Sequence, residues 1–221
     1  MTPAAMIFDF DGVLIDSEFV GNAHVAAYLT GIGHPTSNEE AMARFMGRSG
    51  RDFIDAIEAW IGRPLDEDFH AARRAEDARA LAEGVGAVAG AVDFVSALPP
   101  DLPRAIASSS STAWIARHLD HIGLREAFGP HLYSGKEHVA RGKPAPDVYL
   151  HAAERLGAAI ADCVILEDSI VGATGALASG ARVIGLAAGQ HCGAGHADRL
   201  RALGVREVAG DFGEVRQMVF G

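Results

Sequence analysis

The sequence has 221 residues, 49% of them hydrophobic and 22% charged, which is long enough for one large domain or a core with a smaller insert. Its formal net charge of −10 argues against a nucleic acid partner, because the phosphate backbone attracts basic proteins. No stretch approaches the roughly 18 consecutive apolar residues of a membrane span, and the N-terminus shows no signal peptide, so we expect no membrane partner. Two cysteines, Cys163 and Cys192, are too few for a disulfide framework, which predicts a reducing, cytoplasmic location.

The first predicted strand ends in two carboxylates. Residues 6–10 (MIFDF) form a short apolar run that is typical of a strand buried on both faces. Asp9 and Asp11 are two residues apart and therefore project to the same side of an extended chain, and Gly12 then permits a turn. Buried carboxylates are costly unless a cation or a reaction needs them. The pattern alone also fits a simple turn at Asp11 with Asp9 as a cap.

The chain from residue 16 to residue 86 contains no convincing strand. Helical spacing predicts helices over residues 18–29, 38–45, 53–61 and 66–83. Ser37 and Glu40 match a capping box at the start of the second helix, and Ser49 is a suitable cap for the third. We therefore expect an all-helical cap domain over residues 16–86, inserted into a core of residues 1–15 and 87–221.

From residue 90 onward, apolar strands alternate with short helices. The predicted strands are residues 104–108, 131–134, 163–168, 182–186 and 206–209. Such alternation gives right-handed crossovers, so the predicted fold class is α/β, a doubly wound parallel sheet with a helical domain inserted after the first strand. In such sheets the binding site lies beyond the C-terminal ends of the strands, near the point where the strand order reverses.

Polar clusters stand at the C-terminal ends of four strands or in the loops that follow. They are Asp9 with Asp11, Ser108–Ser111, the Gly142–Asp147 loop with Lys143, and Glu167–Ser169. Because parallel strands end at one edge, we expect these clusters to converge. The carboxylates can hold Mg²⁺, which prefers oxygen ligands, whereas hydroxyls and the ammonium of Lys143 can bind phosphate oxygens. Lys143 is one of only two lysines in an arginine-rich chain, which favours a need for a compact ammonium there.

The segments DFDGVLIDSE, IASSSS, GKPAPD and LEDS resemble, in this order, the four motifs of the haloacid dehalogenase-like (HAD) phosphohydrolase superfamily. The resemblance covers the whole chain and implies a Rossmann-like catalytic core with a helical cap. It implies that Asp9 is the nucleophile that takes the phosphoryl group and that Asp11 is the general acid and base. The implied phosphate-binding residues are Ser108, Ser109 and Lys143. The implied Mg²⁺ ligands are Asp9, Asp11 through its carbonyl oxygen, Asp168, and Glu167 as a ligand or as an acid behind the ligands.

The chemistry agrees with these residue types. A carboxylate that attacks phosphorus needs the charge of its anionic substrate cancelled, which Mg²⁺ and Lys143 can do. Asp11 can protonate the leaving oxygen and then activate the water that hydrolyses an aspartyl phosphate.

Simpler interpretations apply to other features. Residues 109–112 can be merely the start of a helix, and Trp60 and Trp114 are predicted to be core residues on helices. The ten histidines show no metal-ligand spacing, and residues 187–196 are interpreted as a surface loop without zinc, at the sheet's edge and near the mouth of the predicted site.

The cap pattern is similar to the β-phosphoglucomutase-like and sugar-phosphatase branch, and most similar to bacterial 6-phosphogluconate phosphatases. The resemblance implies a Mg²⁺-dependent phosphatase of small phosphorylated metabolites such as sugar phosphates or 6-phosphogluconate, acting through an aspartyl phosphate, and we expect a monomer. Arg48, Arg51 and Arg74 are candidate substrate contacts in the cap, although a solvated helix face is the simpler explanation of each.

Three kinds of relative with other activities each differ from this chain at one diagnostic position. Haloacid dehalogenases lack the second aspartate, which is Asp11 here, and phosphonoacetaldehyde hydrolase needs a cap lysine, which this chain does not have. β-Phosphoglucomutase carries a cap histidine where this chain has Gly21, and His24 lies one helical turn later. A phosphosugar mutase therefore stays open as the alternative, as does a non-catalytic phosphate-binding protein of the same superfamily.

Overall fold

The computed structural model describes residues 2–46, 48 and 50–221. The chain forms two compact units, one of Met1–Asp16 with Gly86–Gly221 and one of Ser17–Val85. We call them the core unit and the helical unit. Among the described residues, no helix is long and apolar enough to cross a membrane.

The core unit contains a six-stranded sheet in which all neighbouring strands are parallel. The strands are β1 (Ala5–Phe8), β2 (Arg104–Ser108), β3 (Leu132–Ser134), β4 (Cys163–Glu167), β5 (Arg182–Leu186) and β6 (Glu207–Ala209). Their order is β3-β2-β1-β4-β5-β6, so the order reverses between β1 and β4. The predicted doubly wound α/β fold is confirmed, and its switch point lies where Asp9 and Asp168 follow their strands.

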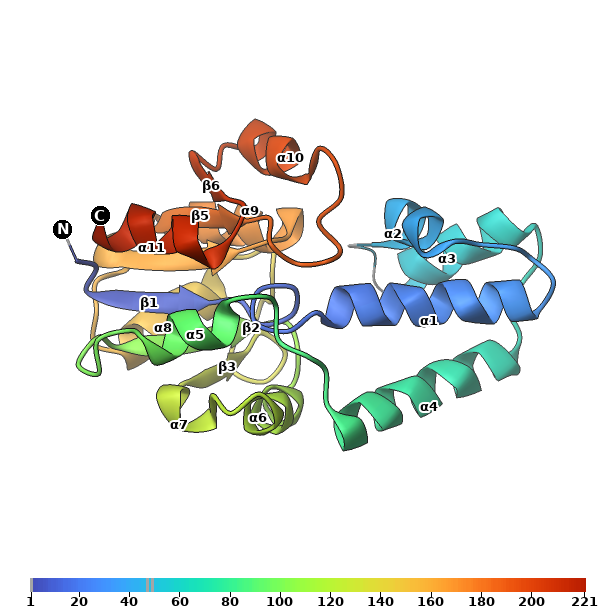
Figure 1. The fold of residues 1–221 in the computed structure, drawn as a ribbon, viewed down its shortest axis with the longest axis horizontal. Coiled ribbons are helices and arrows are strands. Elements are labelled where there is room, and N and C mark those ends of the chain that lie inside the picture. The colour runs from blue at the N-terminus through green and yellow to red at the C-terminus, as the bar shows by residue number, and fades with distance from the viewer. Residues whose placement is uncertain (1, 47, 49) are drawn as a thin grey trace. The chain divides into compact units, whose positions relative to one another are not determined.

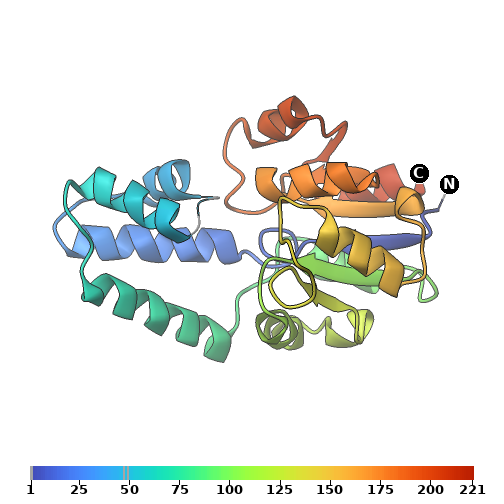
Figure 2. The same ribbon diagram turned by 180° about the vertical axis from the view of Figure 1, so that it is seen from behind.

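Helices cover both faces of this sheet (Figures 1 and 2). They are α5 (Ala91–Ser96), α6 (Thr112–His121), α7 (Arg125–Phe128), α8 (Asp147–Arg155), α9 (Ile170–Ser179), α10 (His196–Leu203) and α11 (Phe212–Phe220), with a 3₁₀ turn at Ile160–Asp162. In Figure 1, α5 and α11 lie in front of the sheet, whereas α8 and α9 lie in front of it in the reversed view of Figure 2.

Strand β1 is buried on both faces, as its apolar run predicts. Ile7 belongs to the core cluster that includes Val148 of α8. The ring of Phe8, the next residue, meets Phe94 of α5 and Phe128 of α7 edge-on, with ring centroids 6.3 Å and 5.6 Å away. Because successive side chains alternate across a strand, this one strand fixes both helical layers to the sheet.

The helical unit has a core of its own. Its helices are α1 (Ser17–Gly31), α2 (Asn38–Phe45), α3 (Gly50–Ile61) and α4 (Glu67–Glu83), and its described residues form no strand. Val25, Phe45 and Phe69 are among the side chains that form this core. The capping box is confirmed, since the Ser37 hydroxyl accepts from the N–H of Glu40 and the Glu40 carboxylate accepts from the N–H of Ser37. Ser49, the predicted cap of α3, lies outside the described residues.

Helix α9 begins directly against the end of β4. Ser169 is its N-cap and accepts a hydrogen bond from the N–H of Gly172. A Cβ atom on Gly172 would lie 1.6 Å from Oε1 of Glu167, so only glycine lets the helix pass this carboxylate. Gly21 in α1 is a contrast, since nothing lies within 4 Å of the position that its Cβ would take.

Replacing each of the two glycines by alanine should have opposite effects on the stability of the protein. Gly172→Ala should lower the free energy of unfolding by about 1–3 kcal/mol, because the added methyl group must displace the Glu167 side chain or the helix backbone. Gly21→Ala should raise it by about 0.5–1 kcal/mol, because alanine loses less backbone entropy in a helix. Urea denaturation followed by circular dichroism measures both, and a neutral or stabilising Gly172→Ala would contradict the packing described.

Candidate active site

The turn after β1 brings two strand ends together. Gly12 adopts a φ of +83°, and its N–H donates to the carbonyl of Ile15. A Cβ on Gly12 would lie 2.3 Å from Oδ2 of Asp168, which follows β4. The glycine is therefore required both by its backbone angle and by the close approach of the turn to this carboxylate.

Lys143 joins the ends of two strands. Its ammonium Nζ lies 2.7 Å from Oδ1 of Asp9 and 2.6 Å from Oε1 of Glu167. The Lys143 side chain is 4% exposed and the Glu167 side chain is completely buried. Burying these charges is costly and is offset only where they pair, so the three groups depend on one another.

Both carboxylate oxygens of Glu167 are already occupied by hydrogen bonds. Its Oε1 accepts hydrogen bonds from Lys143 and from the hydroxyl of Tyr149, and its Oε2 accepts from both the N–H and the hydroxyl of Ser169. This saturation favours the second of the two predicted roles, in which Glu167 orients Lys143 from behind the metal ligands.

The three buried groups shift one another's ionisation. Burial, followed by the charge of Glu167, raises the pKa of Asp9 well above its usual value, although Lys143 opposes this. Burial alone would lower the pKa of Lys143, but the carboxylates of Asp9 and Glu167 raise it well above its usual value. Burial would also raise the pKa of Glu167, and the ammonium of Lys143 lowers it instead. Lys143 and Glu167 are thus a charged pair, and Asp9 is the carboxyl group whose ionisation this burial disfavours.

The donor set at this edge fits a divalent cation. Oxygen atoms of Asp9, Glu167 and Asp168 lie within 4.8 Å of one another, and all three residues are buried. Three carboxylates face one ammonium, so a hard cation such as Mg²⁺ would balance the charge and favour the ionised form of Asp9. Asp9 and Asp168 are the side chains suited to hold it. The carboxylate of Asp11, whose carbonyl oxygen was the predicted ligand, is not part of this cluster.

Asp11 is held by the segment that follows β2. Its Oδ2 accepts a 2.6 Å hydrogen bond from the Ser110 hydroxyl and a long one, 3.4 Å, from Ser108. Its Oδ1 accepts a 3.1 Å hydrogen bond from the indole N–H of Trp114 in the first turn of α6. The prediction that Trp114 is merely a core residue is therefore wrong, because its N–H serves the predicted acid and base.

The predicted phosphate-binding serines differ in exposure. Ser108 is buried, and its hydroxyl accepts from the N–H of Ser110, whereas Ser109 is exposed at the strand end. Ser111 caps α6 by accepting from the N–H of Trp114, so part of the serine run does start a helix. The sequence offered one indication that Trp114 contacts the site, namely its place in the first helical turn after the polar end of β2.

The loop of residues 187–196 was predicted to lie at the surface, and for its histidines this is wrong. His191 is buried, and its Nε2 lies 2.8 Å from Oδ2 of Asp168. His196 is buried as well, and its Nε2 lies 2.7 Å from the backbone carbonyl oxygen of Asp168. Both imidazoles therefore hold the predicted metal ligand, one by its side chain and the other by its backbone.

The three predicted substrate arginines of the helical unit are exposed and form ion pairs. Arg48 pairs with Asp52, Arg51 with Asp55 and Glu58, and Arg74 with Glu67. Each pair lies within the helical unit, and that of Arg51 with Asp55 has the i,i+4 spacing expected of a solvated helix face.

Comparison with known proteins places the chain in a family. The family model of haloacid dehalogenase-like hydrolases matches residues 3–180. The chain is 27% identical over 188 residues to 6-phosphogluconate phosphatase from Escherichia coli (strain K12), covering 85% of this chain and 84% of that protein. It is 33% identical over 181 residues to hexitol phosphatase A from the same organism, with 80% of each covered.

A solved structure agrees. A HAD family hydrolase from Deinococcus radiodurans R1, crystallised with bound phosphate and sodium, superposes with a TM-score of 0.87 at 31% identity, covering 99% of this chain and 95% of that one. The chain therefore belongs to the haloacid dehalogenase-like hydrolases, which confirms the resemblance of its four motifs. Within that family it is a phosphoric monoester hydrolase, as its curated relatives are.

The contact between Trp114 and Asp11 generates a prediction about leaving groups. Trp114→Phe keeps an aromatic ring but removes the hydrogen bond that positions Asp11, worth about 0.5–1.5 kcal/mol, so kcat/KM for an alkyl phosphate should fall by up to about tenfold. p-Nitrophenyl phosphate should lose less, because nitrophenolate departs without needing a proton from Asp11.

Trp60→Phe is the matched control for this substitution. The Trp60 indole N–H also donates a 3.1 Å hydrogen bond, to the hydroxyl of Thr36 in the helical unit, so its loss should leave both rates unchanged. Equal losses on the alkyl and aryl substrates in Trp114→Phe would show that Trp114 does not position a proton donor.

Proposed function

We propose that the protein is a Mg²⁺-dependent phosphatase that hydrolyses small phosphorylated metabolites through a phosphoryl group carried on Asp9. The observation that carries the proposal is the buried ammonium of Lys143 between the carboxylates of Asp9 and Glu167, with Asp168 in the same cluster. It supports a site in which a carboxylate approaches an anionic substrate under the cover of positive charge.

Asp9 is the proposed nucleophile. One of its carboxylate oxygens attacks phosphorus, the bond from phosphorus to the leaving oxygen breaks, and an aspartyl phosphate forms. Lys143 keeps its proton throughout, since Asp9 and Glu167 hold its pKa well above the usual value. It therefore orients Asp9 and, with Ser108 and Ser109, is proposed to bind the phosphoryl oxygens. A bound Mg²⁺, held by Asp9 and Asp168, would supply further neutralisation of charge on the transferring group.

Asp11 is the proposed acid and base. It gives a proton to the oxygen of the departing alcohol and is then ionised. In the second half of the reaction it takes a proton from water, whose oxygen attacks the phosphorus of the aspartyl phosphate and releases inorganic phosphate and Asp9. The hydrogen bonds from Ser110 and Trp114 hold the Asp11 side chain in place for both proton transfers.

The substrate class is proposed to be sugar phosphates and related acids, including 6-phosphogluconate. The names of the two curated relatives support it, since one acts on 6-phosphogluconate and the other on a hexitol phosphate. The substrate contacts proposed in the cap are Arg48, Arg51 and Arg74, which would have to exchange their present carboxylate partners for a carboxylate of the substrate. We also propose a monomer in a reducing, cytoplasmic setting, which the two free cysteines support.

The role of Asp9 is tested by one substitution with a matched control. Asp9→Asn should leave the fold intact and lower kcat by about three orders of magnitude or more, because an amide oxygen is a poor nucleophile. Asp93→Asn, at an exposed position of α5, should change nothing. A chelator should abolish the wild-type activity and added Mg²⁺ should restore it. Normal turnover in Asp9→Asn, or full activity in chelator, would sink the proposal.

A phosphosugar mutase is the second candidate, and Gly21 of the helical unit argues against it. A mutase must protect its phosphoenzyme from water until the bisphosphate intermediate has turned over. Gly21 offers no side chain for this task, and open space surrounds the position of its Cβ. His24, one helical turn later, interacts electrostatically with Glu76, Arg73 and Arg79 of α4. Burial lowers the pKa of its imidazole.

We therefore predict that β-glucose 1-phosphate, as far as it reacts, yields glucose and inorganic phosphate. Phosphorus NMR with and without added glucose 1,6-bisphosphate distinguishes the products. Stoichiometric glucose 6-phosphate with little free phosphate would establish a mutase.

A further inference from the structure

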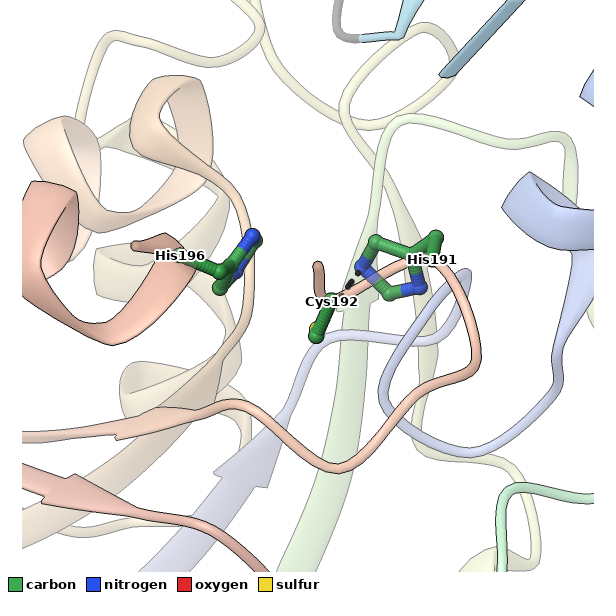
Figure 3. Close-up of side chains that lie close together, drawn as sticks. All are labelled: His191, Cys192 and His196. Carbon is green, nitrogen blue, oxygen red and sulfur yellow. Dashed lines mark hydrogen bonds between the residues drawn. The ribbon is translucent and has the colours of Figure 1, made fainter. Parts of the chain in front are cut away.

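A second group of metal-binding side chains lies outside the carboxylate cluster. His191 and Cys192 follow β5 in the loop, and His196 is the first residue of α10. One ligand atom from each of the three residues lies within 4.8 Å of the other two. Figure 3 shows Cys192 between the imidazoles of His191 and His196, with a hydrogen bond joining Cys192 to His191.

The donors of this group differ in kind from those of the carboxylate cluster. Two imidazoles and a thiol suit Zn²⁺ and similar transition-metal ions, whereas Mg²⁺ prefers oxygen. Burial raises the pKa of the Cys192 thiol to about 12, so an ion must have a high affinity for thiolate to displace its proton. Cys192 is only partly buried, which gives an ion access from solvent.

His196 makes a hydrogen bond of the kind that metal-binding histidines commonly make. Its Nε2 donates to the carbonyl oxygen of Asp168 at 2.7 Å, which leaves the lone pair on Nδ1. Such a hydrogen bond to a carbonyl fixes the tautomer and the ring plane of a histidine ligand. Arg199 comes within 3.4 Å of Nδ1, but its residue is exposed and its guanidinium can turn into solvent.

His191 links this group to the phosphatase site. Its Nε2 lies 3.3 Å from Sγ of Cys192 and 2.8 Å from Oδ2 of Asp168. The ring is confined, since a Cβ on Gly12 would lie 2.9 Å from its Cε1 and a Cβ on Gly189 would lie 2.5 Å from the same atom. A metal ion that takes Nε2 therefore competes with the carboxylate of Asp168 for one atom, and the ring has little room to serve both from another position.

We propose that His191, Cys192 and His196 bind a transition-metal ion of the Zn²⁺ type, and that this ion inhibits the phosphatase by taking His191 away from Asp168. When the ion binds, the thiol proton of Cys192 passes to solvent, the proton on Nε2 of His191 passes to Nδ1 of the same ring or to solvent, and no electron is transferred. The inhibition rests on the proposed function, whereas the binding does not.

Cobalt(II) tests the binding directly. The whole protein is first saturated with Mg²⁺ and then titrated with Co²⁺, and the absorption band of charge transfer from thiolate to cobalt is followed. We expect one equivalent to give the band in the wild type and in Cys163→Ser, which removes the other, buried cysteine of β4. Cys192→Ser should abolish the band and His196→Ala should weaken it. A wild type without the band, or a band that survives in Cys192→Ser, would overturn the site.

Zn²⁺ inhibition tests the coupling to Asp168. With Mg²⁺ in excess, the Zn²⁺ concentration for half inhibition should rise about tenfold or more in Cys192→Ser and stay unchanged in Cys163→Ser. Equal inhibition of the wild type and Cys192→Ser would overturn the coupling. A cobalt band in a protein that proves to have no phosphatase activity would support the metal site and refute the proposed function.

Discussion

The buried ammonium of Lys143 is the interaction on which the rest of the site depends. It lies between the carboxylates of Asp9 and Glu167, and all three side chains are buried. Each charge would be costly without its partners, because water cannot solvate it there. Buried ion pairs add little to stability compared with apolar packing. Their presence at the C-terminal ends of the strands therefore indicates a catalytic or binding role. The hydroxyl of Tyr149, the cap of α9 and the missing side chain of Gly172 all serve to hold the third member, Glu167.

Much of this arrangement could be predicted from the sequence, because it follows from the topology of the sheet. Alternating strands and helices give a parallel sheet, and a parallel sheet collects its strand ends at one edge. Asp9 and Asp168 lie just beyond their strands, Glu167 is the last residue of β4, and Lys143 lies in the loop after β3. Their convergence therefore required no knowledge of side-chain direction. The capping box of α2 was equally predictable, since its hydrogen bonds span only three residues.

The contacts around these residues could not be predicted in the same way. The bond from Trp114 to Asp11 joins residues 103 positions apart, and periodicity shows which helix face is apolar but not where an indole N–H points. His191 and His196 lie in a glycine-rich loop without a regular period, so their burial against Asp168 left no pattern in the sequence. The ion pair of Arg51 with Asp55 is of the opposite kind, because a carboxylate four residues later makes it expected on any solvated helix.

Each of the three proposed catalytic carboxylates is thus held by a different set of neighbouring side chains. Lys143 and Glu167 prepare Asp9, and Ser110 and Trp114 hold Asp11, while the two imidazoles of the loop hold Asp168. The stereochemical course at phosphorus tests the division between Asp9 and Asp11 most directly, with a substrate whose phosphoryl oxygens are isotopically distinct. Each in-line displacement inverts phosphorus, so transfer to Asp9 followed by attack of water predicts net retention of configuration. Net inversion would show that water attacks the substrate directly and would contradict a nucleophilic Asp9.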